Sequence, residues 1–275
     1  MVLNIRKLLE GARLALVLTM LSVLALGGCT TVPVNLEERK AYYETNDPIE
    51  PVNRAILSFN RGLDTIVLKP VASAYKNILP QILQDGIRNF LNNLRSPIIL
   101  ANNLLQGDID GARDTIARFT LNSIIGFGGF GDPAGDLGVK YRSEDFGQTL
   151  GVWGTGEGPY LMLPVLGPSN PRDLTGRFVD WASDPIKLWA DNTNRDAIPV
   201  SRLLMRGVDR RARSLKTLDE LEKSSLDFYA TVRSLYRQVR DDEIRNGDTD
   251  DTIPAPIISF SKDPDLIGPR AQVIK

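Results

Sequence analysis

The chain has 275 residues, with 33 lysines and arginines against 34 aspartates and glutamates, and it contains no histidine. This near-neutral charge is not that of a nucleic-acid binder, which needs a strong basic excess. Without histidine the commonest general base and metal ligand are missing, so an enzyme of this sequence would depend on carboxylate, lysine or tyrosine chemistry. Cys29 is the only cysteine, so no disulfide can form within the chain and the fold must hold by packing.

The first 28 residues have the pattern of a secretory signal. Basic Arg6, Lys7 and Arg13 accompany the apolar run Leu14–Leu26, which has only about half the ~20 residues of a membrane-spanning helix. Leu26-Gly27-Gly28-Cys29 follows and resembles a bacterial lipobox, in which the cysteine is acylated and becomes the first residue. A plain signal peptide followed by a chance cysteine is the alternative. We therefore expect residues 1–28 to be removed and Cys29 to carry lipid, which leaves no thiol for a metal site or a nucleophile.

Composition divides the rest of the chain into three parts. Residues 29–46 are polar without a clear apolar period and are predicted to be a tether. Residues 47–247 carry the helical patterns of a folded domain. Residues 248–275 are acidic and contain proline, which is typical of a disordered tail.

The folded part is predicted to open with a capped helix. In Asp47-Pro48-Ile49-Glu50, Asp47 suits the N-cap, Pro48 the first helical position and Glu50 a capping box. Apolar residues then recur until Pro70, before which the helix should end.

The clearest helical period runs from Ile82 to Leu94. Six apolar residues fall on one half of this helix (Ile82, Leu83, Ile87, Phe90, Leu91 and Leu94), and six polar residues fall on the other (Gln84, Asp85, Arg88, Asn89, Asn92 and Arg95). Such a stripe usually packs against other helices of its own domain, but beside a lipid anchor it can also lie among acyl chains.

Two more helices should follow closely. Ser96-Pro97 is predicted to cap and start one that ends at Gly107, and Asp108 to start the next, which continues through Ile125. The second helix is apolar around much of its girth, so we expect it to be buried on several sides.

Glycine and proline dominate from Gly126 to Asp173, which predicts a long ordered loop system with short strands or turns. Asp184-Pro185 should start another capped helix, and helical periodicity returns over Ser201–Arg245 until Asn246-Gly247. The predicted fold class is therefore all-α.

Gly126, Gly128 and Gly131 match the spacing of a dinucleotide-binding motif. The motif follows a helical pattern instead of a strand, and Asp132-Pro133 follows it instead of a helix N-terminus. No nucleotide cofactor is expected, and no other cofactor or metal.

Two charged clusters have both a functional and a structural interpretation. Glu144 and Asp145 are adjacent carboxylates of the kind that perform acid–base chemistry, although neighbours in sequence rarely face each other across a substrate and capping or ion pairing is the commoner role. Arg206, Arg210 and Arg213 follow helical spacing and could bind lipid headgroups or an acidic partner. The structural interpretation, which we favour, is a solvated face paired with nearby acidic residues (Asp209, Asp219 and Glu220).

Five ordered sequence blocks resemble the MlaA (VacJ) lipoprotein family. They are Asn46–Arg54 with Phe59-Asn60, Asn102–Asp108, Arg118–Asn122 with Gly126–Gly129, Glu144–Gly151 with Trp153-Gly154, and Gly158–Tyr160 continuing to Arg172-Asp173. The resemblance covers roughly Asn46 to Gly247. The family-motif positions are Asp47, Pro48, Asn53, Arg54, Asn60, Gln106, Gly107, Asp108, Glu144, Phe146, Gly147, Gly151, Gly158, Pro159, Tyr160, Arg172 and Asp173.

One stretch departs from the family pattern. Ser224–Tyr229 stands where many members carry an Asp-Pro-Tyr turn. The C-terminal helix is therefore expected to be less broken in this chain.

The resemblance implies an all-helical ring that lies in the inner leaflet of the outer membrane around a central amphipathic channel. Misplaced outer-leaflet phospholipids would pass through this channel to a soluble periplasmic carrier that feeds an ATP-driven inner-membrane complex, and the protein would associate with trimeric porins. Thr30 after the cysteine agrees with outer-membrane targeting. The polar side chains Asn89, Asn92 and Arg88 are candidates for the channel lining.

Two other functions compete with this non-enzymatic one. The first is an envelope hydrolase that uses Glu144 or Asp145. The second is a structural lipoprotein that scaffolds porins.

Overall fold

The computed structural model describes residues 45–246, so the predicted signal, Cys29, most of the tether and the tail lie outside the described residues. The described chain is mostly helical, as predicted. Its helices are α3 (Glu50–Leu63), α4 (Lys69–Ile78), α5 (Gln81–Asn93), α6 (Ser96–Gln106), α7 (Ile109–Ile124), α8 (Pro133–Asp136), α9 (Phe146–Val152), α10 (Pro171–Ser183), α11 (Pro185–Asn192), α12 (Ala197–Arg213), α13 (Leu215–Ser224) and α14 (Phe228–Ile244).

The described residues form two compact units. Unit 1 contains the residues up to Val71 together with Glu157–Pro171, and unit 2 contains Ala72–Gly156 and the residues from Arg172. Unit 1 holds the only strands in the described part of the chain, an antiparallel hairpin of β1 (Leu161–Leu163) and β2 (Gly167–Ser169) that pairs Met162 with Pro168.

The first helix of unit 1 begins later than predicted. Ile49 occupies the N-cap position of α3, and Pro51, not Pro48, lies in its first turn. The Asp47 side chain instead accepts a hydrogen bond from Asn53 Nδ2 (2.8 Å), which explains why it does not cap the helix. Glu50 pairs with Arg54 one turn on (2.7 Å) and closes no capping box.

The helix also fails to end before Pro70, contrary to the prediction. A π-helical turn, Asp64–Leu68, joins α3 to α4, and the Lys69 N–H donates to the Asp64 carbonyl five residues back. Proline cannot donate to the helical ladder and its ring crowds the preceding turn. The wider π turn relieves this crowding, so the helix continues through Pro70.

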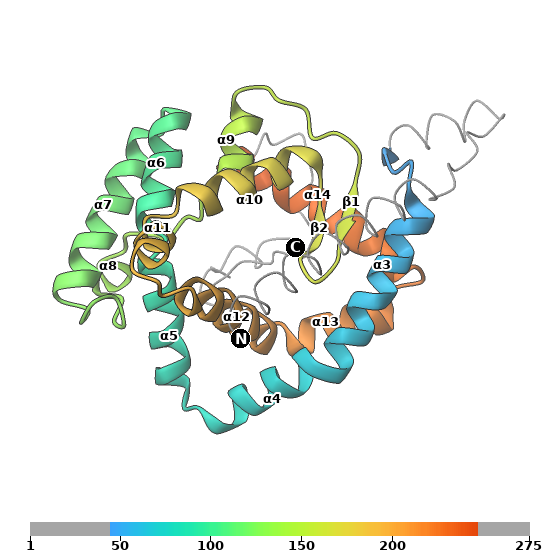
Figure 1. The fold of residues 1–275 in the computed structure, drawn as a ribbon, viewed down its shortest axis with the longest axis horizontal. Helices are drawn as coiled ribbons and strands as arrows, with labels where there is room; N and C mark the ends of the chain where they lie inside the picture. Colours follow the sequence, from blue (N-terminus) through green and yellow to red (C-terminus); the bar gives the residue numbers. More distant parts are fainter. Residues whose placement is uncertain (1–44, 247–275) are drawn as a thin grey trace, which may run out of the picture. The chain divides into compact units, whose positions relative to one another are not determined.

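In unit 2, α6 and α7 lie side by side as an antiparallel pair (Figure 1). Their connection was predicted well, because Gly107 ends α6 with a left-handed φ of 77° and the Asp108 side chain caps α7 by accepting from the Gly111 N–H. The predicted cap at Ser96 was wrong. Ser96 is already the first residue of α6, and Arg95 with helical backbone angles stands at the N-cap position.

The glycine- and proline-rich stretch is more structured than predicted. Asp132 caps the short helix α8, so a helix does begin directly after the Gly126–Gly131 turns, contrary to prediction. Asp145 caps α9, which packs against both α6 and α14. Asp184 caps α11, as predicted.

The last periodic segment forms three helices instead of one continuous run. Helices α12 and α13 meet at Ser214, and Ser225 adopts extended backbone angles before Asp227 caps α14. The expectation of a less broken C-terminal helix was therefore wrong, because Asp227 provides a helix start without the Asp-Pro-Tyr turn.

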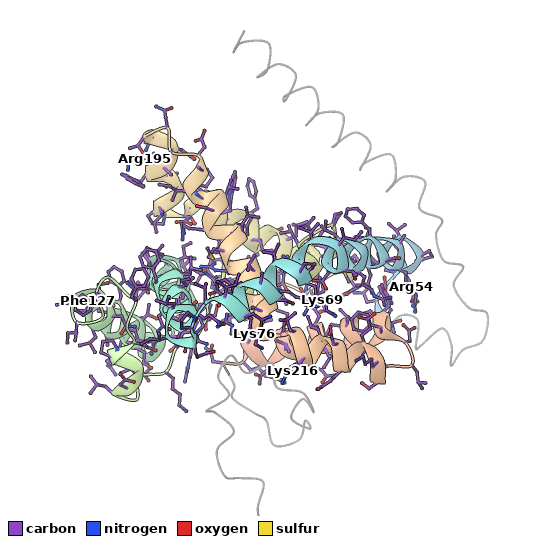
Figure 2. All side chains as sticks on the ribbon, turned by 90° about the horizontal axis from the view of Figure 1, so that it is seen from below. Arg54, Lys69, Lys76, Phe127, Arg195 and Lys216 are labelled. Atoms are coloured by element: carbon purple, nitrogen blue, oxygen red, sulfur yellow. The ribbon has the colours of Figure 1, made fainter. Side chains whose placement is uncertain are left out.

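The distribution of polar and apolar side chains is inverted relative to an ordinary globular protein. Tyr160 and Ile99 are the only apolar members among the largest fully buried described side chains; the others are Gln148, Asn53, Asn103, Asn170, Thr149 and Ser169. Many large apolar side chains are exposed instead. One example is Phe127, which is 88% exposed in the loop that follows α7 (Figure 2).

The prediction that α7 is buried on several sides was wrong. Only Gly111, Ala112 and Asn122 of this helix are buried, whereas its large apolar residues are exposed (Ile109, Ile116, Phe119 and Ile124). The stripe on α5 is divided, because Ile82 and Leu83 at its start are exposed while Leu91 is buried. Gln84 of the opposite half is buried as well. Among the described helices, none is long and apolar enough to cross a bilayer.

The closest approach of two helices in unit 2 supplies a stability test. A Cβ added to Gly176 in α10 would lie 2.1 Å from the Gly147 backbone nitrogen in α9, whereas a Cβ at Gly207 in α12 would meet nothing within 4 Å. We expect Gly176→Ala to lower the free energy of unfolding by about 3 kcal/mol or more through overpacking. Gly207→Ala should raise it by about 0.5–1 kcal/mol, since alanine favours a helix interior.

Thermal and urea unfolding of the detergent-solubilised protein, followed by circular dichroism, measures both changes. Equal stability of the Gly176→Ala variant and the unmodified protein would contradict the close packing of α9 on α10.

Candidate functional site

In unit 1, the opening family motif holds the hairpin segment. Asn46 Nδ2 donates to the Gly158 carbonyl (2.7 Å), so the folded part already includes this residue. Asn53 holds the backbone at the start of β1 through both ends of its side-chain amide. Its nitrogen donates to the Tyr160 carbonyl (3.0 Å), and its oxygen accepts from the Met162 N–H (2.9 Å). Two motif blocks that lie over 100 residues apart in sequence are thus one structural feature.

Asn60 performs the same role at the hairpin turn. Its amide donates to the Leu163 carbonyl (2.9 Å), and its oxygen accepts from the N–H of Val165 (2.8 Å), whose φ is 66°. A β-branched residue at positive φ is strained, and the paired hydrogen bonds of Asn60 hold it there. At the other end of the segment, Gly158 has a φ of 72° and approaches the Pro171 ring, while Pro159 follows it in the bend.

In unit 2, the motif residue Gln106 joins α6 to the start of α9. Its Nε2 lies 3.1 Å from Glu144 Oε2 and 3.2 Å from Thr149 Oγ1. Thr149 Oγ1 in turn donates to Asn102 (2.8 Å), whose amide reaches Asp180 of α10 (3.1 Å). These buried polar groups are therefore paired with one another, as burial requires.

Glu144 is only 2% exposed, and it has no cation partner within ion-pair distance among the described residues. Burial raises its pKa from 4.5 to about 7, opposed by the hydrogen bond from Gln106 and reinforced by the nearby negative charge of Asp145. Asp145 has a different environment, because it caps α9 and pairs with Arg240 (2.9 Å). The predicted capping and ion-pairing role is confirmed for Asp145.

Arg240 of α14 is the charged hub of unit 2. Its guanidinium is mostly buried and contacts Asp145, Asp173 (2.8 Å) and Glu243 (2.8 Å). Burial alone would raise the pKa of Asp173, but the hydrogen bonds and charge of Arg240 lower it overall. Asp173 also accepts from Tyr236 and from Arg172 Nε (3.1 Å). The Arg172-Asp173 motif therefore anchors α10 to α14.

Two motif glycines make room for this arrangement. Gly147 lies against Gly176 and the Asp173 backbone, and Gly151 lies against the Ile244 side chain of α14. Neighbouring Phe146 donates its N–H to Asp180 (3.1 Å) and stacks edge-on with Trp153. The motif positions of unit 2 thus place α9 between α10 and α14.

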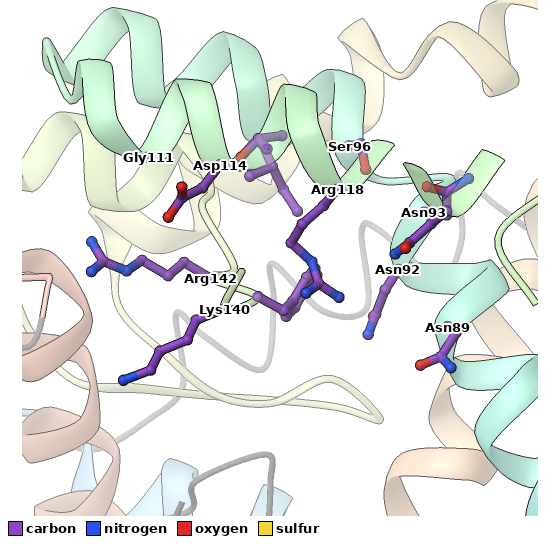
Figure 3. Close-up of a pocket in the computed structure, with 13 residues that line it drawn as sticks. Asn89, Asn92, Asn93, Ser96, Gly111, Asp114, Arg118, Lys140 and Arg142 are labelled. Atoms are coloured by element: carbon purple, nitrogen blue, oxygen red, sulfur yellow. The ribbon is translucent and has the colours of Figure 1, made fainter. Parts of the chain in front are cut away.

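A polar pocket lies between α5, α7 and the segment Lys140–Arg142 (Figure 3). Asn89 and Asn92, two of the proposed lining residues, take part in its wall together with Asp114 and Arg118. The third, Arg88, pairs with Asp85 on the same helix (2.9 Å) and is not among the pocket residues. Within the described residues, no group of acidic and cysteine side chains could hold a metal ion.

Arg118 fixes the glycine-rich region beside this pocket. It makes a bidentate pair with Asp132 (2.6 and 2.7 Å) and also contacts the Val139 carbonyl. Asn122 donates to the same carboxylate (2.8 Å). The three glycines of the dinucleotide-like spacing therefore belong to a turn that is tied to α7, with no strand before it.

The arginines of α12 agree only in part with the predicted paired face. Arg213 pairs with Asp209 (2.5 Å) and the neighbouring Arg211 with Asp219 (3.6 Å), so the predicted ion pairing is present. The face is not solvated as predicted, because Asp209 and Arg211 are buried. Arg206 instead donates to the backbone carbonyl of Leu91 in α5 (3.0 Å).

Sequence reasoning missed Arg240 as a functional residue, because its partners Asp145 and Asp173 lie 95 and 67 residues away. It also missed Asp180, whose neighbours come from α6 and α9. A buried arginine shows no local signal, although the adjacent Glu144-Asp145 and Arg172-Asp173 pairs did indicate charged positions.

The raised pKa of Glu144 predicts that the free energy of unfolding depends on pH. Between pH about 4.5 and 7 the folded protein holds a proton here that the unfolded chain releases, so the free energy of unfolding falls as pH rises through this window. Glu144→Gln keeps an oxygen that can accept the hydrogen bond from Gln106. It removes the titrating group and with it this fall of the free energy of unfolding with pH. At pH 8 the variant should be more stable by on the order of 2 kcal/mol, and at pH 4.5 nearly equal.

Urea unfolding at both pH values measures the difference, with the exposed Glu220→Gln as a control that should leave the pH dependence unchanged. A Glu144→Gln effect of the same size at pH 4.5 and pH 8 would contradict the assignment.

A family model described as MlaA lipoprotein matches residues 45–243. The chain is 36% identical over 236 residues to a protein of Escherichia coli K12 named intermembrane phospholipid transport system lipoprotein MlaA, covering 82% of this chain and 89% of that one. It is 36% identical to an uncharacterized protein of Rickettsia bellii over 203 residues, which is 74% of this chain and 78% of the relative.

A solved structure has a fold similar to that of this chain. Its TM-score with this chain is 0.65 at 34% identity, over 72% of this chain and 98% of the solved one, and it comes from work on the structural basis for maintenance of bacterial outer membrane lipid asymmetry. The five sequence blocks, the helical fold and the three comparisons agree, and the chain belongs to the MlaA lipoprotein family.

Proposed function

We propose that this protein is a lipoprotein, anchored through Cys29 in the inner leaflet of the outer membrane, that removes misplaced phospholipids from the outer leaflet and so maintains lipid asymmetry. The observation that carries this proposal is the inverted surface, with exposed apolar side chains on helices such as α7 and hydrogen-bonded polar groups inside. The names of the relatives, which refer to phospholipid transport, support it.

The physical problem in phospholipid transfer is the headgroup. A charged headgroup that crosses hydrocarbon unaided loses its hydration, at a cost of many kcal/mol. A ring of helices with apolar faces toward lipid and a polar channel would give the headgroup a wet path while the acyl chains stay in an apolar environment. Asn89, Asn92 and Arg88 are the proposed lining residues, and the first two already border a polar pocket.

The transport route needs partners at both ends. We propose that trimeric porins hold the protein in the outer membrane and that a soluble periplasmic carrier accepts the phospholipid and delivers it to an ATP-driven inner-membrane complex. No bond in the lipid needs to be broken or formed on this route.

The competing hydrolase would need Glu144 and Asp145 to face a substrate together. Asp145 is occupied by Arg240 and by the cap of α9, while Glu144 is buried against Gln106. Neither carboxylate lines the polar pocket. The transport function therefore accounts better for both residues.

A deletion strain tests the proposal through the phospholipid content of its outer leaflet and its sensitivity to detergent with EDTA. The unmodified gene should restore both, whereas Cys29→Ala should restore neither because the protein loses its anchor. Glu144→Gln should restore both fully. Full rescue by Cys29→Ala would contradict membrane embedding, and loss of function in a stable Glu144→Gln variant would favour the hydrolase.

The porin-scaffold alternative gives a different result in the same strain. A pure scaffold would change porin assembly and leave outer-leaflet phospholipid content at its normal level.

A further inference from the structure

Three arginines of unit 2 approach one another from two helices. Arg206 and Arg210 lie one turn apart on the same face of α12, which packs against α5. The Arg206 guanidinium donates to the carbonyl of Leu91 in α5, four residues before Arg95, which stands at the N-cap position of α6. Arg95 Nη1 in turn donates to Ser143 Oγ (3.1 Å). Arg95 acts electrostatically on both Arg206 and Arg210, so the three positive charges lie near one another beside the contact of α5 with α12.

These three arginines differ from their neighbours in lacking a carboxylate partner. Within residues 45–246, none of Arg95, Arg206 and Arg210 has a carboxylate oxygen within 4.0 Å. By contrast, Arg202 on the same helix pairs with Asp184 (2.9 Å). Arg206 uses one of its five N–H donors on a backbone carbonyl, so the others remain available.

The mutual repulsion of these arginines favours the binding of an anion between them. Burial lowers the pKa of Arg206 to about 10, and repulsion from Arg95 adds to this effect. Arg210 is exposed by surface area. Desolvation by the atoms around its guanidinium still lowers its pKa, Arg95 and Arg177 add to this effect, and Glu243 and Tyr141 act against it. Arginine stays charged at neutral pH even so, and an anion between these groups would relieve the repulsion.

The shape of the guanidinium indicates which anion fits. Its planar fork binds phosphate through two parallel hydrogen bonds and is the usual choice where phosphate is recognised. Tyr141, which acts electrostatically on both Arg206 and Arg210, is flanked in the sequence by Lys140 and Arg142. These two cationic residues line the polar pocket (Figure 3).

We propose that Arg95, Arg206 and Arg210 form a binding site for the phosphodiester of a phospholipid headgroup. This inference rests on the proposed function, since it gives that function a recognition step. The site would prefer phospholipids over uncharged diacylglycerols, which share the acyl chains and lack the phosphate.

The test uses the full-length lipoprotein in uncharged detergent and isothermal titration with dihexanoyl phosphatidylglycerol, dihexanoylglycerol and inorganic phosphate. Arg206→Gln with Arg210→Gln should weaken binding of the phospholipid about 10-fold or more and leave dihexanoylglycerol binding within about 2-fold. The matched control Arg113→Gln with Arg195→Gln removes the same charge from two exposed positions and should change neither.

A second measurement does not depend on the folding of any variant. Raising NaCl from about 50 to about 500 mM should weaken phospholipid binding by the unmodified protein about 10-fold without changing dihexanoylglycerol binding, because salt screens only the charged contact.

Four outcomes would overturn the inference. Unchanged phospholipid binding by the double variant together with no salt effect would refute the arginine site alone and leave transport intact. An equal loss of dihexanoylglycerol binding would show that the arginines hold the structure instead of the phosphate. Inorganic phosphate that binds as tightly as the phospholipid would make this a free-phosphate site. An unmodified protein that binds neither lipid would refute the proposed function as well.

Discussion

A polar group removed from water must find another partner, and this requirement governs the interior of the protein. The buried side chains are unusually polar, and asparagine, glutamine, threonine and serine dominate the largest of them. Many of them are joined by hydrogen bonds, as in the chain from Gln106 through Thr149 and Asn102 to Asp180, although Asn103 Oδ1 and Gln148 Oε1 are buried without a partner. Because such groups satisfy one another, the helices can turn apolar side chains outward, where an aqueous protein would place polar ones.

The buried ion pairs of Arg240 meet the same requirement, and the free-energy cost of a missing partner is larger for a charge than for a neutral group. Arg240 neutralises Asp145 and Asp173, which come from two other helices. Removing one partner of such a buried group leaves an uncompensated charge, which typically costs about 3–5 kcal/mol. The motif glycines let the helices approach closely enough for these contacts. The sequence blocks shared with the family therefore encode a polar scaffold, while Arg95, Arg206 and Arg210, which we propose bind a phosphate, have no carboxylate partner within residues 45–246.

Local features of the fold were predictable from sequence, and features that depend on distant residues or on the surroundings were not. Asp108 and Asp184 cap helices because the signal lies within a few residues. The helix through Pro70 was missed because the π turn that accommodates it has no simple sequence pattern. For α7, apolar composition indicated contact with an apolar environment, but periodicity does not distinguish a protein core from lipid. In the candidate site, Glu144 and Asp145 were noted, whereas Arg240 is defined only by packing.

The account depends on helices whose outward side chains lie in hydrocarbon. The three tryptophans of the chain, Trp153, Trp181 and Trp189, are all exposed. The most direct measurement is their fluorescence in the full-length lipoprotein reconstituted into vesicles of phospholipids brominated on the acyl chains. Contact with these chains should quench more than about half of the emission seen in unbrominated vesicles, since bromine quenches only at close range. Equal emission in both kinds of vesicle would show that the apolar surface lies outside the bilayer and would contradict the account.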